Sequence, residues 1–563
     1  MSDAAATARR WLDVDPDPET RAETEQLLAE GGPALDERFN GRLEFGTAGI
    51  RGAMGAGPMR MNRVLARATA AAVGRALLVD HEAPTVAIGY DARRQSDLFA
   101  EDSARVLAGL GVASLLLPGP LPTPVLAHTL LRTGAEAGIM VTASHNPRPD
   151  NGIKVYWSDG AQIVPPIDRR ISALIDEQFD EQFDGGALPT DDDLADDDHP
   201  LITRGTAADI ESYVVAAAGL SGLEAPHDLA IAYTPLHGVG RDVLVDTLTL
   251  AGFAPPHVVA EQAEPDGTFP TVEFPNPEEP GALDLVLALA DATGADLVLA
   301  NDPDADRLAV AIPSGDGWRA LSGDEIGALL AEHVLAGGSG DDRLVATTLV
   351  SSRLLSAQAA HHGVRYADTL TGFKWIVRPG LADPTARFVF GYEEALGYLV
   401  GDLTHDKDGI TAAVVFAEMA ATAKAAGRTV LDLLHDLWRR HGVHRTALRT
   451  VRIDGPDGDD RMAALLAEFR ASPPSEVAGH PVLATTDYAQ PGTGLPASDL
   501  IALELDGGRL LLRPSGTEPM LKVYGEVVEP VRDNDVQAAE TRAGDTVAAL
   551  VDAAAALLVG SGS

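Results

Sequence analysis

Short apolar runs alternate with stretches of helical periodicity along most of the chain. The first group of elements has apolar runs at 85–90, 113–117 and 137–141, with a helical pattern at 98–110. Short apolar runs favour buried strands, and strands that alternate with helices favour βαβ units with largely parallel sheets. The pattern therefore predicts an α/β fold for this part of the chain.

The same order of elements recurs twice. The predicted strands of the second and third groups are 228–233, 256–260, 295–300, 343–349, 364–370 and 387–390. In each group the third strand runs directly into an unusually polar loop, and ligands gather beyond the carboxyl ends of parallel strands. We therefore predict three similar units that offer three different loops to one cleft.

The chain after about residue 445 has another pattern. Short predicted strands and helical stretches follow one another there at 450–453, 461–471, 500–505, 509–513, 521–526 and 537–558. This order favours an α+β domain with a more antiparallel sheet. The prediction is α/β overall: three similar mixed-sheet α/β domains plus a C-terminal α+β domain, arranged around a central cleft. The expected domain ranges are 1–204, 205–318, 319–444 and 445–563.

The composition narrows the class of protein. The chain has 563 residues, too many for one hydrophobic core, and its 45% of apolar residues is ordinary for a folded protein. The net charge of −41 argues against nucleic acid as a partner, because a phosphate backbone demands clustered Lys and Arg. The absence of cysteine excludes thiol catalysis, disulfides and Cys-ligated metals. No apolar run resembles a signal peptide or a membrane span, so we expect a soluble cytoplasmic protein.

Lysine is rare, and its positions are informative. It occurs only at 154, 374, 407, 424 and 522, so arginine supplies nearly all of the positive charge. A lysine kept in such a background indicates a need for a compact or titratable ammonium, which arginine cannot replace. Lys424 lies in an Ala-rich helical stretch, whereas the other four lysines lie within or beside the motifs described next.

Three aspartates follow the third predicted strand of the second group. Asp302, Asp304 and Asp306 occupy alternate positions, a spacing that lets a tight loop turn three carboxylates toward one hard cation. Oxygen-only ligation selects Mg²⁺ or Ca²⁺ over Zn²⁺. An EF-hand would need Gly and Glu where the chain has Arg307 and Pro313, so that alternative fails. We therefore predict a Mg²⁺ site that leaves coordination positions for a phosphate oxygen.

The corresponding loop of the first group is TASHNP at 142–147, and it contains Ser144. A hydrolase would place its serine in a G-x-S-x-G elbow, which is absent, and His145 is poorly placed to act on an adjacent residue. Phosphoryl transfer needs only a metal and cations near the oxygen, because it depends mostly on positioning and charge stabilisation. Since the aspartate loop supplies the metal, Ser144 is predicted to carry a phosphoryl group.

Three further segments carry candidate ligands for a sugar phosphate. Glu393 follows the third strand of the third group, and its carboxylate suits two vicinal sugar hydroxyls, whereas we interpret Glu394 as acidity at a helix N-terminus. The run RPSGTEP at 513–519 combines a fork-shaped cation, two hydroxyls and a glycine, which is typical of a phosphate cradle. Arg51 lies in the Gly-rich run FGTAGIRG, where it could aim a cation at a transferring phosphoryl group.

The motifs FGTAGIRG, TASHNP, DPDADR, GYEEALGY and RPSGTEP occur in this order and cover about residues 45–525. In this respect the chain resembles the α-D-phosphohexomutase superfamily, which includes phosphoglucomutases and phosphomannomutases. The resemblance implies four domains around a central cleft and an isomerase that acts as an intramolecular phosphotransferase. It also implies that Ser144 is the phosphoserine, and that Mg²⁺ is bound by its phosphate and by Asp302, Asp304 and Asp306.

The resemblance implies further roles. Arg51 and Arg307 would contact the transferring phosphate or the substrate, Glu393 the sugar hydroxyls, and His145 and Lys154 are acid/base candidates. The other implied substrate contacts are Thr371, Gly372, Lys374, Lys407, Arg513, Ser515, Gly516 and Thr517, of which the last four form the loop for the distal phosphate. The implied partner is a small sugar phosphate, with a sugar bisphosphate as activator and intermediate, and neither nucleic acid nor a membrane. The implied assembly is a monomer or a homodimer.

One departure from the family leaves the sugar open. The family commonly pairs the glutamate with a serine two residues on, and here that position is Ala395. GYEEALGY looks more like the longer phosphoglucomutase and phosphopentomutase branch. The sequence therefore predicts a mutase for the 1- and 6-positions of glucose or mannose, with a phosphopentomutase as the alternative. Two hypotheses from other functional classes are a metal-dependent phosphatase and a catalytically silent sugar-phosphate sensor.

Overall fold

The computed structural model divides the chain into two compact units. Unit 1 comprises Met1–Leu321 with Gly397–Ala425, and unit 2 comprises Ser322–Leu396 with Ala426–Ser563. The described residues are 3–46, 49–180, 187–222, 225–315, 317–453, 458–514 and 520–560. The structure divides the chain into two units, whereas the sequence analysis expects four domains. The four domain ranges and the central cleft therefore stay predictions.

The first sheet of unit 1 has the strand order β1-β5-β4-β2-β3-β6. Its strands are β1 (Ile50–Ala53), β2 (Thr85–Tyr90), β3 (Ala113–Leu116), β4 (Ala137–Val141), β5 (Asp150–Trp157) and β6 (Ile202–Arg204). Strands β2, β3, β4 and β6 are parallel, whereas β5 runs antiparallel to β4 and to β1. The sheet is therefore mixed, as predicted for this domain.

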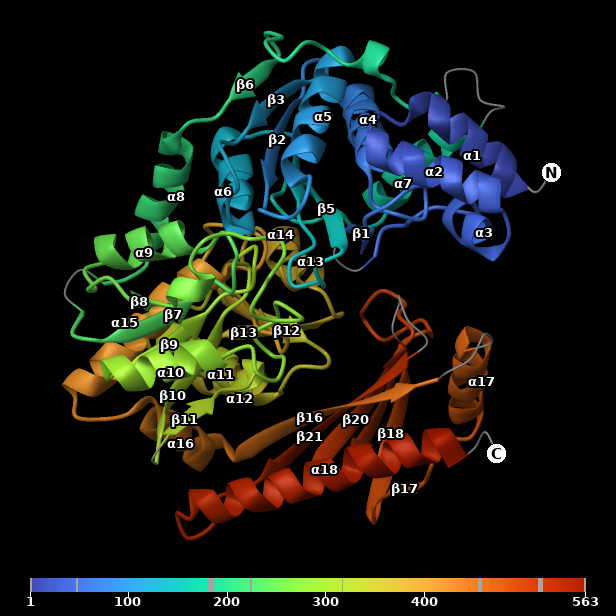
Figure 1. Ribbon diagram of the computed structural model, residues 1–563. Helices are drawn as coiled ribbons and strands as arrows, with labels where there is room; N and C mark the ends of the chain where they lie inside the picture. Colours follow the sequence, from blue (N-terminus) through green and yellow to red (C-terminus); the bar gives the residue numbers. More distant parts are fainter. Residues whose placement is uncertain are drawn as a thin grey trace. The chain divides into compact units, whose positions relative to one another are not determined.

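Helices pack on this sheet and against one another. They are α4 (Arg63–Asp80), α5 (Ser96–Gly109), α6 (Thr123–Thr133) and α7 (Ile167–Phe179). Figure 1 shows α4 beside α5, and both α5 and α6 contact β2. The Asn62 side chain caps α4 by accepting a 3.0 Å hydrogen bond from the Leu65 amide, which satisfies one of the free donors of a helix start.

Three short helices precede the first sheet. They are α1 (Asp3–Val14), α2 (Pro18–Glu30) and α3 (Pro33–Phe39). The buried ring of Trp11 meets Phe39 edge-on at 6.1 Å and stacks on Phe179 at 6.3 Å between centroids. Aromatic packing of this kind ties the N-terminal helices to α7.

The second sheet of unit 1 has the order β11-β10-β9-β7-β8. Its strands are β7 (Ile231–Thr234), β8 (His257–Val258), β9 (Leu297–Ala300), β10 (Ala309–Ser314) and β11 (Gly317–Ala320). Helices α8 (Ala207–Ala218), α9 (Arg241–Leu250) and α10 (Asp284–Thr293) belong to the same part of the chain. Strand β15 (Gly397–Val400) and helix α15 (Gly409–Ala425) also belong to unit 1, and α15 packs against α8 and α9.

Unit 2 begins with α11 (Gly323–Gly337), which starts with a capping box between Ser322 and Glu325. The elements that follow are β12 (Arg343–Thr348), α12 (Leu354–His362), β13 (Arg365–Thr369), α13 (Phe373–Ile376), α14 (Arg378–Ala382), β14 (Arg387–Glu393) and α16 (Val430–His441). Strand β12 pairs in parallel with both β13 and β14. Helix α12 packs on α11 and on both β12 and β13.

The C-terminal sheet of unit 2 has the order β16-β21-β20-β19-β18-β17. Its strands are β16 (Val443–Arg452), β17 (Glu476–Val477), β18 (His480–Asp487), β19 (Ile501–Leu505), β20 (Gly508–Pro514) and β21 (Met520–Glu529). All of its pairings are antiparallel. Helices α17 (Gly458–Ala471) and α18 (Val536–Gly560) complete this α+β domain, and Figure 1 shows α18 lying along the sheet.

The predicted threefold repetition is present in the strand order. In each of the three groups the first strand is central, and the second and third strands flank it in parallel: β3-β2-β4, β8-β7-β9 and β13-β12-β14. Each third strand leads into its predicted polar loop. A non-glycine residue with a left-handed backbone lies in each loop: Ser144, Ala305 and Leu396, with φ of 51°, 55° and 60°. Such residues are uncommon and concentrate at functional sites.

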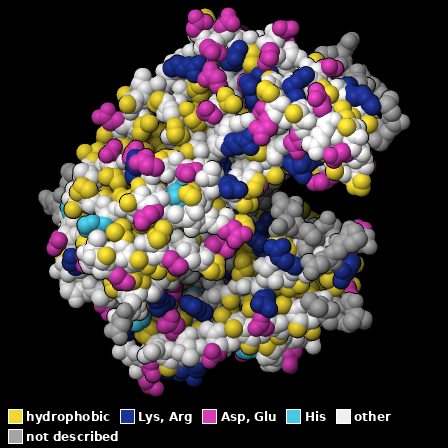
Figure 2. All heavy atoms as spheres, viewed as in Figure 1, with side chains coloured by type: hydrophobic (Ala, Val, Ile, Leu, Met, Phe, Trp, Pro, Cys, Tyr) yellow, Lys and Arg dark blue, Asp and Glu magenta, His cyan; other side chains and the backbone are white. Residues whose placement is uncertain are grey.

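Acidic side chains are dispersed over the face of the molecule that Figure 2 shows. Figure 2 shows Asp and Glu side chains scattered over the face in view, with Lys and Arg among them. In the described part of the chain, no single helix combines the length and the apolar composition needed to cross a membrane, although α15 and α16 together would pass that test.

Candidate active site

The Ser144 loop leaves the end of β4, and the serine side chain is buried at 1% exposure. The Ser144 amide donates to Thr142 Oγ1 at 2.8 Å, which tightens the turn. The Ser144 hydroxyl donates to Asp302 Oδ2 at 2.6 Å. The loops of the first two groups therefore meet in unit 1, as the sequence predicts.

The aspartate loop presents three buried carboxylates to one point. One oxygen from each of Asp302, Asp304 and Asp306 lies within 4.8 Å of the others, and all three side chains have no exposed surface. Asp304 Oδ1 and Asp306 Oδ1 are shielded from solvent without a hydrogen-bond partner. Buried carboxylate oxygens left unpaired are costly, and an oxygen-seeking divalent cation would satisfy them. The residues present thus fit Mg²⁺.

Two of the rare lysines lie against the same carboxylates. Lys154 Nζ, fully buried on β5, is 2.7 Å from Asp304 Oδ2 and 2.6 Å from Asp306 Oδ2. Lys407 Nζ lies 3.3 Å from Asp306 Oδ2 and is 5% exposed. The two ammonium groups neutralise part of the charge of the triad, which explains how three carboxylates can be buried together.

The pKa values of this cluster are strongly perturbed. Burial, and then the charges of Asp304 and Asp306, raise the pKa of Asp302 well above its ordinary value. Burial opposes the ionised form of Asp304 as well, but the Lys154 ammonium outweighs it and holds the pKa of Asp304 below its usual range. For Lys154, burial would lower the pKa, yet Asp304 and Asp306 hold it above its ordinary value. Lys154 is therefore an ammonium here, whereas a general base would need a lowered pKa.

His145 is closer to its neighbour than expected. Its Nδ1 lies 3.1 Å from Ser144 Oγ, although an adjacent histidine was expected to be poorly placed to act on the serine. Burial, and then the cations Arg307 and Arg51, hold the pKa of His145 well below its ordinary value. A lowered pKa favours the neutral imidazole, and 24% of the side chain is exposed.

The predicted arginines flank the serine and the aspartates. Arg51, on β1, donates from Nη1 to Asn146 Oδ1 at 3.3 Å. Its Nε is shielded from solvent without a hydrogen-bond partner. The Arg307 amide donates to Asp302 Oδ1 at 3.0 Å, and its guanidinium Nε lies 3.8 Å from Asp306 Oδ1. The site of unit 1 is therefore lined by cations around one cluster of carboxylates.

The predicted sugar-binding loop of unit 2, residues 393–396 (the sugar loop), differs from the prediction in one respect. Glu393 ends β14 and is 7% exposed, whereas Glu394 lies in a turn, so the predicted helix start at Glu394 is wrong. The Glu394 carboxylate accepts hydrogen bonds from Ser351 Oγ at 2.9 Å and from Thr348 Oγ1 at 3.3 Å. Burial, and then the Glu393 charge, raise the pKa of Glu394 to about 7.

The other predicted substrate contacts of unit 2 lie in two places. Gly372, with a φ of 108°, precedes the short helix α13 that carries Lys374, and the Thr371 hydroxyl is shielded without a hydrogen-bond partner. Arg513 lies on β20, opposite Lys522 on β21. Ser515, Gly516 and Thr517 lie outside the described residues.

The structure also brings in residues that the sequence analysis missed. Thr123, at the start of α6, donates from Oγ1 to Asp304 Oδ2 at 2.8 Å. Tyr156 donates to Asp406 Oδ2 at 2.7 Å and so holds the segment that carries Lys407. Arg93 contacts the Ser144 loop from the carboxyl end of β2. The sequence signal for Arg93 was available, because the polar run that follows β2 occupies the same kind of position as the predicted loops.

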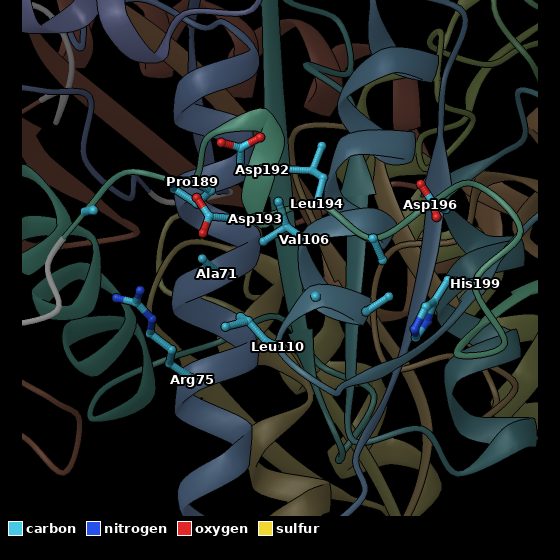
Figure 3. Close-up of a pocket in the computed structure, with 14 residues that line it drawn as sticks. Ala71, Arg75, Val106, Leu110, Pro189, Asp192, Asp193, Leu194, Asp196 and His199 are labelled. Atoms are coloured by element: carbon cyan, nitrogen blue, oxygen red, sulfur yellow. The ribbon is translucent and has the colours of Figure 1, made fainter.

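A separate hollow of about 630 Å³ lies in unit 1. It is bounded by parts of α4 and α5 and by residues 187–199, and Figure 3 shows Arg75, Asp192, Asp193 and His199 around it. None of the predicted site residues that the structure describes lines it. Residues Asp191–Asp193 form a short 3₁₀ turn with exposed side chains there, and Asp191 pairs with Arg67 at 2.9 Å.

Comparison with known proteins identifies the family of this chain. Four models that describe the phosphoglucomutase/phosphomannomutase α/β/α domains I, II and III and the C-terminal domain match residues 42–182, 211–315, 322–441 and 451–543. The chain belongs to the phosphoglucomutase/phosphomannomutase family. It is therefore a mutase, an enzyme that transfers a phosphoryl group within its substrate, with the four-domain architecture of that family.

Relatives in this family carry different names. A Haemophilus influenzae protein described as a probable phosphomannomutase is 41% identical over 83% of this chain and 93% of its own length. The phosphopentomutase of Homo sapiens is 34% identical over 96% of this chain and 94% of its own length. The crystal structure of a phosphoglucomutase/phosphomannomutase family protein from Burkholderia thailandensis has a TM-score of 0.65 over 89% of this chain and 97% of its own, at 20% identity, which shows the shared fold.

Proposed function

We propose that this mutase moves a phosphoryl group between the 1- and 6-positions of a hexose, glucose or mannose, with Ser144 as the phosphoryl carrier. The observation that carries the proposal is the 2.6 Å hydrogen bond between Ser144 Oγ and Asp302 Oδ2, inside a buried cluster of carboxylates and cations. Phosphoryl transfer depends mostly on positioning and charge stabilisation, and this cluster supplies both.

The reaction would proceed by two transfers through a sugar bisphosphate. In the first, the P–Oγ bond of phospho-Ser144 breaks, a P–O bond forms to the free hydroxyl oxygen of the sugar monophosphate, and the hydroxyl proton passes to a base. In the second, the P–O bond of the other phosphate breaks, a new P–Oγ bond forms on Ser144, and the proton returns to the released sugar oxygen. The same bisphosphate would recharge an enzyme that has lost its phosphate.

Mg²⁺ would be held by Asp302, Asp304 and Asp306 together with the serine phosphate. When bound, the ion supplies positive charge that stabilises the transferring phosphoryl group. Arg51 and Arg307 would add cationic contacts to that group. Lys154 and Lys407 already neutralise part of the charge of the triad.

Two residues are candidates for the proton transfer. His145 Nδ1 lies 3.1 Å from Ser144 Oγ, so its imidazole is within reach of a proton that moves to or from this oxygen. Lys154 stays a candidate by resemblance, but its contacts with Asp304 and Asp306 favour a role in charge compensation. His145 is the base that the geometry supports better.

The residues of unit 2 would bind the rest of the substrate. Glu393 would hold two sugar hydroxyls, and Thr371, Gly372, Lys374 and, from unit 1, Lys407 would line the sugar. The distal phosphate would lie on the loop formed by Arg513, Ser515, Gly516 and Thr517. We expect a small sugar phosphate as the partner, with neither nucleic acid nor a membrane, and a cytoplasmic monomer or homodimer.

A phosphopentomutase is the second candidate. Two observations favour it: the 34% identity to the human phosphopentomutase over nearly the whole chain, and Ala395 in place of the usual serine. Such an enzyme would use the same Ser144 chemistry on the 1- and 5-phosphates of ribose or deoxyribose. The two candidates differ only in the sugar that unit 2 accepts.

Intact-mass measurement and a substrate panel test the proposal. The wild-type protein incubated with glucose 1,6-bisphosphate should gain a phosphate-sized mass increment, which Ser144→Ala should lack. Ser114→Ala, at a buried serine of β3 outside the site, is the matched control and should keep it. Conversion of glucose 1-phosphate, mannose 1-phosphate and ribose 1-phosphate then ranks the sugars. Steady release of inorganic phosphate without isomerisation would contradict a mutase and indicate a phosphatase.

A further inference from the structure

One buried arginine holds the backbone of the Ser144 loop. The Nη2 group of Arg93 donates to the carbonyl oxygens of Ser144 at 2.6 Å and Asn146 at 2.5 Å. Its Nη1 group donates to the carbonyl oxygens of Pro147 and Asp150, both at 3.0 Å. All four N–H groups at the end of the guanidinium thus donate to backbone carbonyls within one segment of seven residues, 144–150.

The position of Arg93 is itself fixed. It follows β2, the central strand of the sheet, and its amide donates to Asp91 Oδ1 at 2.9 Å in a tight turn. Its Nε lies 3.6 Å from Asp91 Oδ2, so the carboxylate balances the guanidinium charge. Because the side chain is only 4% exposed, it cannot exchange these partners for water.

A segment of the second group covers the arginine from the other side. The Phe269 ring lies over the Arg93 guanidinium, with 4.9 Å between Cζ and the ring centroid. Phe269 is 3% exposed and has a left-handed φ of 46°. Next to it, a Cβ added at Gly267 would lie 2.8 Å from the Ala92 carbonyl oxygen, so the two backbones touch. Cation–π contact in a buried place is among the stronger interactions of this type.

We propose that Arg93 is a positioning residue for phosphoryl transfer at Ser144, and that Phe269 completes its site. The Ser144 backbone has a left-handed φ of 51°, which costs free energy for a serine and persists only where the surroundings enforce it. Arg93 supplies that enforcement by donating to the carbonyl of Ser144 and to those of Asn146, Pro147 and Asp150. The serine Oγ is thereby directed at Asp302. Because the N–H groups at the end of its guanidinium all donate to the backbone of the loop, Arg93 acts through the loop.

The arrangement requires arginine. A lysine at this position would carry the same charge but offers a single point of donation, which cannot span four carbonyls. The loop would then be held less accurately, and a misplacement of about 1 Å at a reacting atom can cost about 10²-fold in rate. The inference rests on the proposed function, since it assumes that Ser144 is the carrier.

Arg93→Lys tests the inference in the full-length enzyme. We expect kcat to fall by about 10²-fold, with KM within about twofold of the wild type, because ground-state contacts with the sugar are untouched. In single-turnover experiments with glucose 1,6-bisphosphate, phosphorylation of Ser144 should slow by the same factor. The matched control is Arg67→Lys, at an equally buried arginine of α4 that pairs with Asp102. That variant should lose stability but keep the wild-type single-turnover rate.

Phe269→Leu provides a second, milder variant that keeps Arg93 and removes only the ring. We expect a three- to tenfold slower single-turnover phosphorylation, about the size of a cation–π contact. If Arg93→Lys fails to fold, this variant decides. Wild-type single-turnover rates in the folded variants would overturn the Arg93 assignment alone. A wild-type enzyme that never acquires the phosphate on Ser144 would overturn the proposed function instead.

Discussion

The Ser144 hydroxyl lies 2.6 Å from Asp302 Oδ2, although 158 residues separate the two in the chain. The contact joins the loop that follows β4 to the loop that follows β9, which are equivalent loops of two repeated groups. Neither loop forms the site alone. The aspartate loop places a predicted metal site beside the serine. The serine oxygen, in turn, could carry a phosphate to that metal site.

Asp302→Asn should remove most of the activity without unfolding the protein. The change removes one negative charge and one cation ligand from the buried triad, and we expect kcat to fall by about 10²- to 10³-fold. The Mg²⁺-dependent rise in Tm should disappear with it. Asp246→Asn, at an exposed position of α9, is the control and should change neither quantity. Full activity of Asp302→Asn would show that the Asp302 carboxylate is not needed for the reaction.

Lys154→Met should destabilise the metal-free protein and increase the stabilisation by Mg²⁺. Loss of the ammonium leaves Asp304 and Asp306 buried with less compensation, which should cost about 3–5 kcal/mol of unfolding free energy. The ion then meets a more negative triad, so melting curves with and without Mg²⁺ should differ more than in the wild type. Lys424→Met is the control: its exposed ion pair with Asp296 should be worth less than about 1 kcal/mol. Equal melting of both lysine variants would contradict this account.

Gly323→Ala should displace the sugar loop through a clash with its backbone. A Cβ at Gly323, the first residue of α11, would lie 1.9 Å from the Glu394 carbonyl oxygen, so the turn after β14 would have to move. We expect a loss of about 1–3 kcal/mol and a raised KM. Gly337→Ala, at the other end of the same helix, meets nothing within 4 Å and should not destabilise the protein. Denaturant unfolding and steady-state kinetics of the pair check both expectations.

Glu526 should make unit 2 sensitive to acid. Burial opposes its ionised form, but hydrogen bonding to His444 and the Arg509 charge lower its pKa from 4.5 to about 2. A lowered folded-state pKa contributes stability that is complete above about pH 4.5 and is lost as the pH falls toward 2. This contribution is about 3 kcal/mol. The difference in unfolding free energy between the wild type and Glu526→Gln should therefore shrink between pH 5.5 and pH 3.5, and a constant difference would contradict it.

Ala395→Ser should shift the sugar preference. The substitution restores the hydroxyl that the family commonly has two residues after the glutamate, close to the proposed sugar contact Glu393. We expect kcat/KM for glucose 1-phosphate to rise relative to ribose 1-phosphate by about tenfold, the size of one well-placed hydrogen bond. Parallel assays of both substrates measure the ratio. An unchanged ratio would place the choice of sugar elsewhere in unit 2.

The sequence by itself determined the repeated order of elements and the chemistry of the loops. Apolar runs predicted the central strands β2, β7 and β12 closely, because a strand buried on both faces leaves a continuous apolar signal. The Asp triad was readable because three carboxylates in one tight loop share a single chemical use. Strand β18 was missed, since its mostly exposed and half-exposed residues give no apolar run.

Tertiary structure alone decided which charges meet. Lys154 and the aspartates lie about 150 residues apart, and only the packing of β5 beside the aspartate loop makes the lysine a partner of Asp304 and raises its pKa. The approach of His145 to Ser144 and the hydrogen bonds from Arg93 to the loop depend on the folded path of the loop, which no residue pattern predicts. Periodicity records burial along the chain, whereas a site depends on distances between segments, and those distances are set only when the sheets pack.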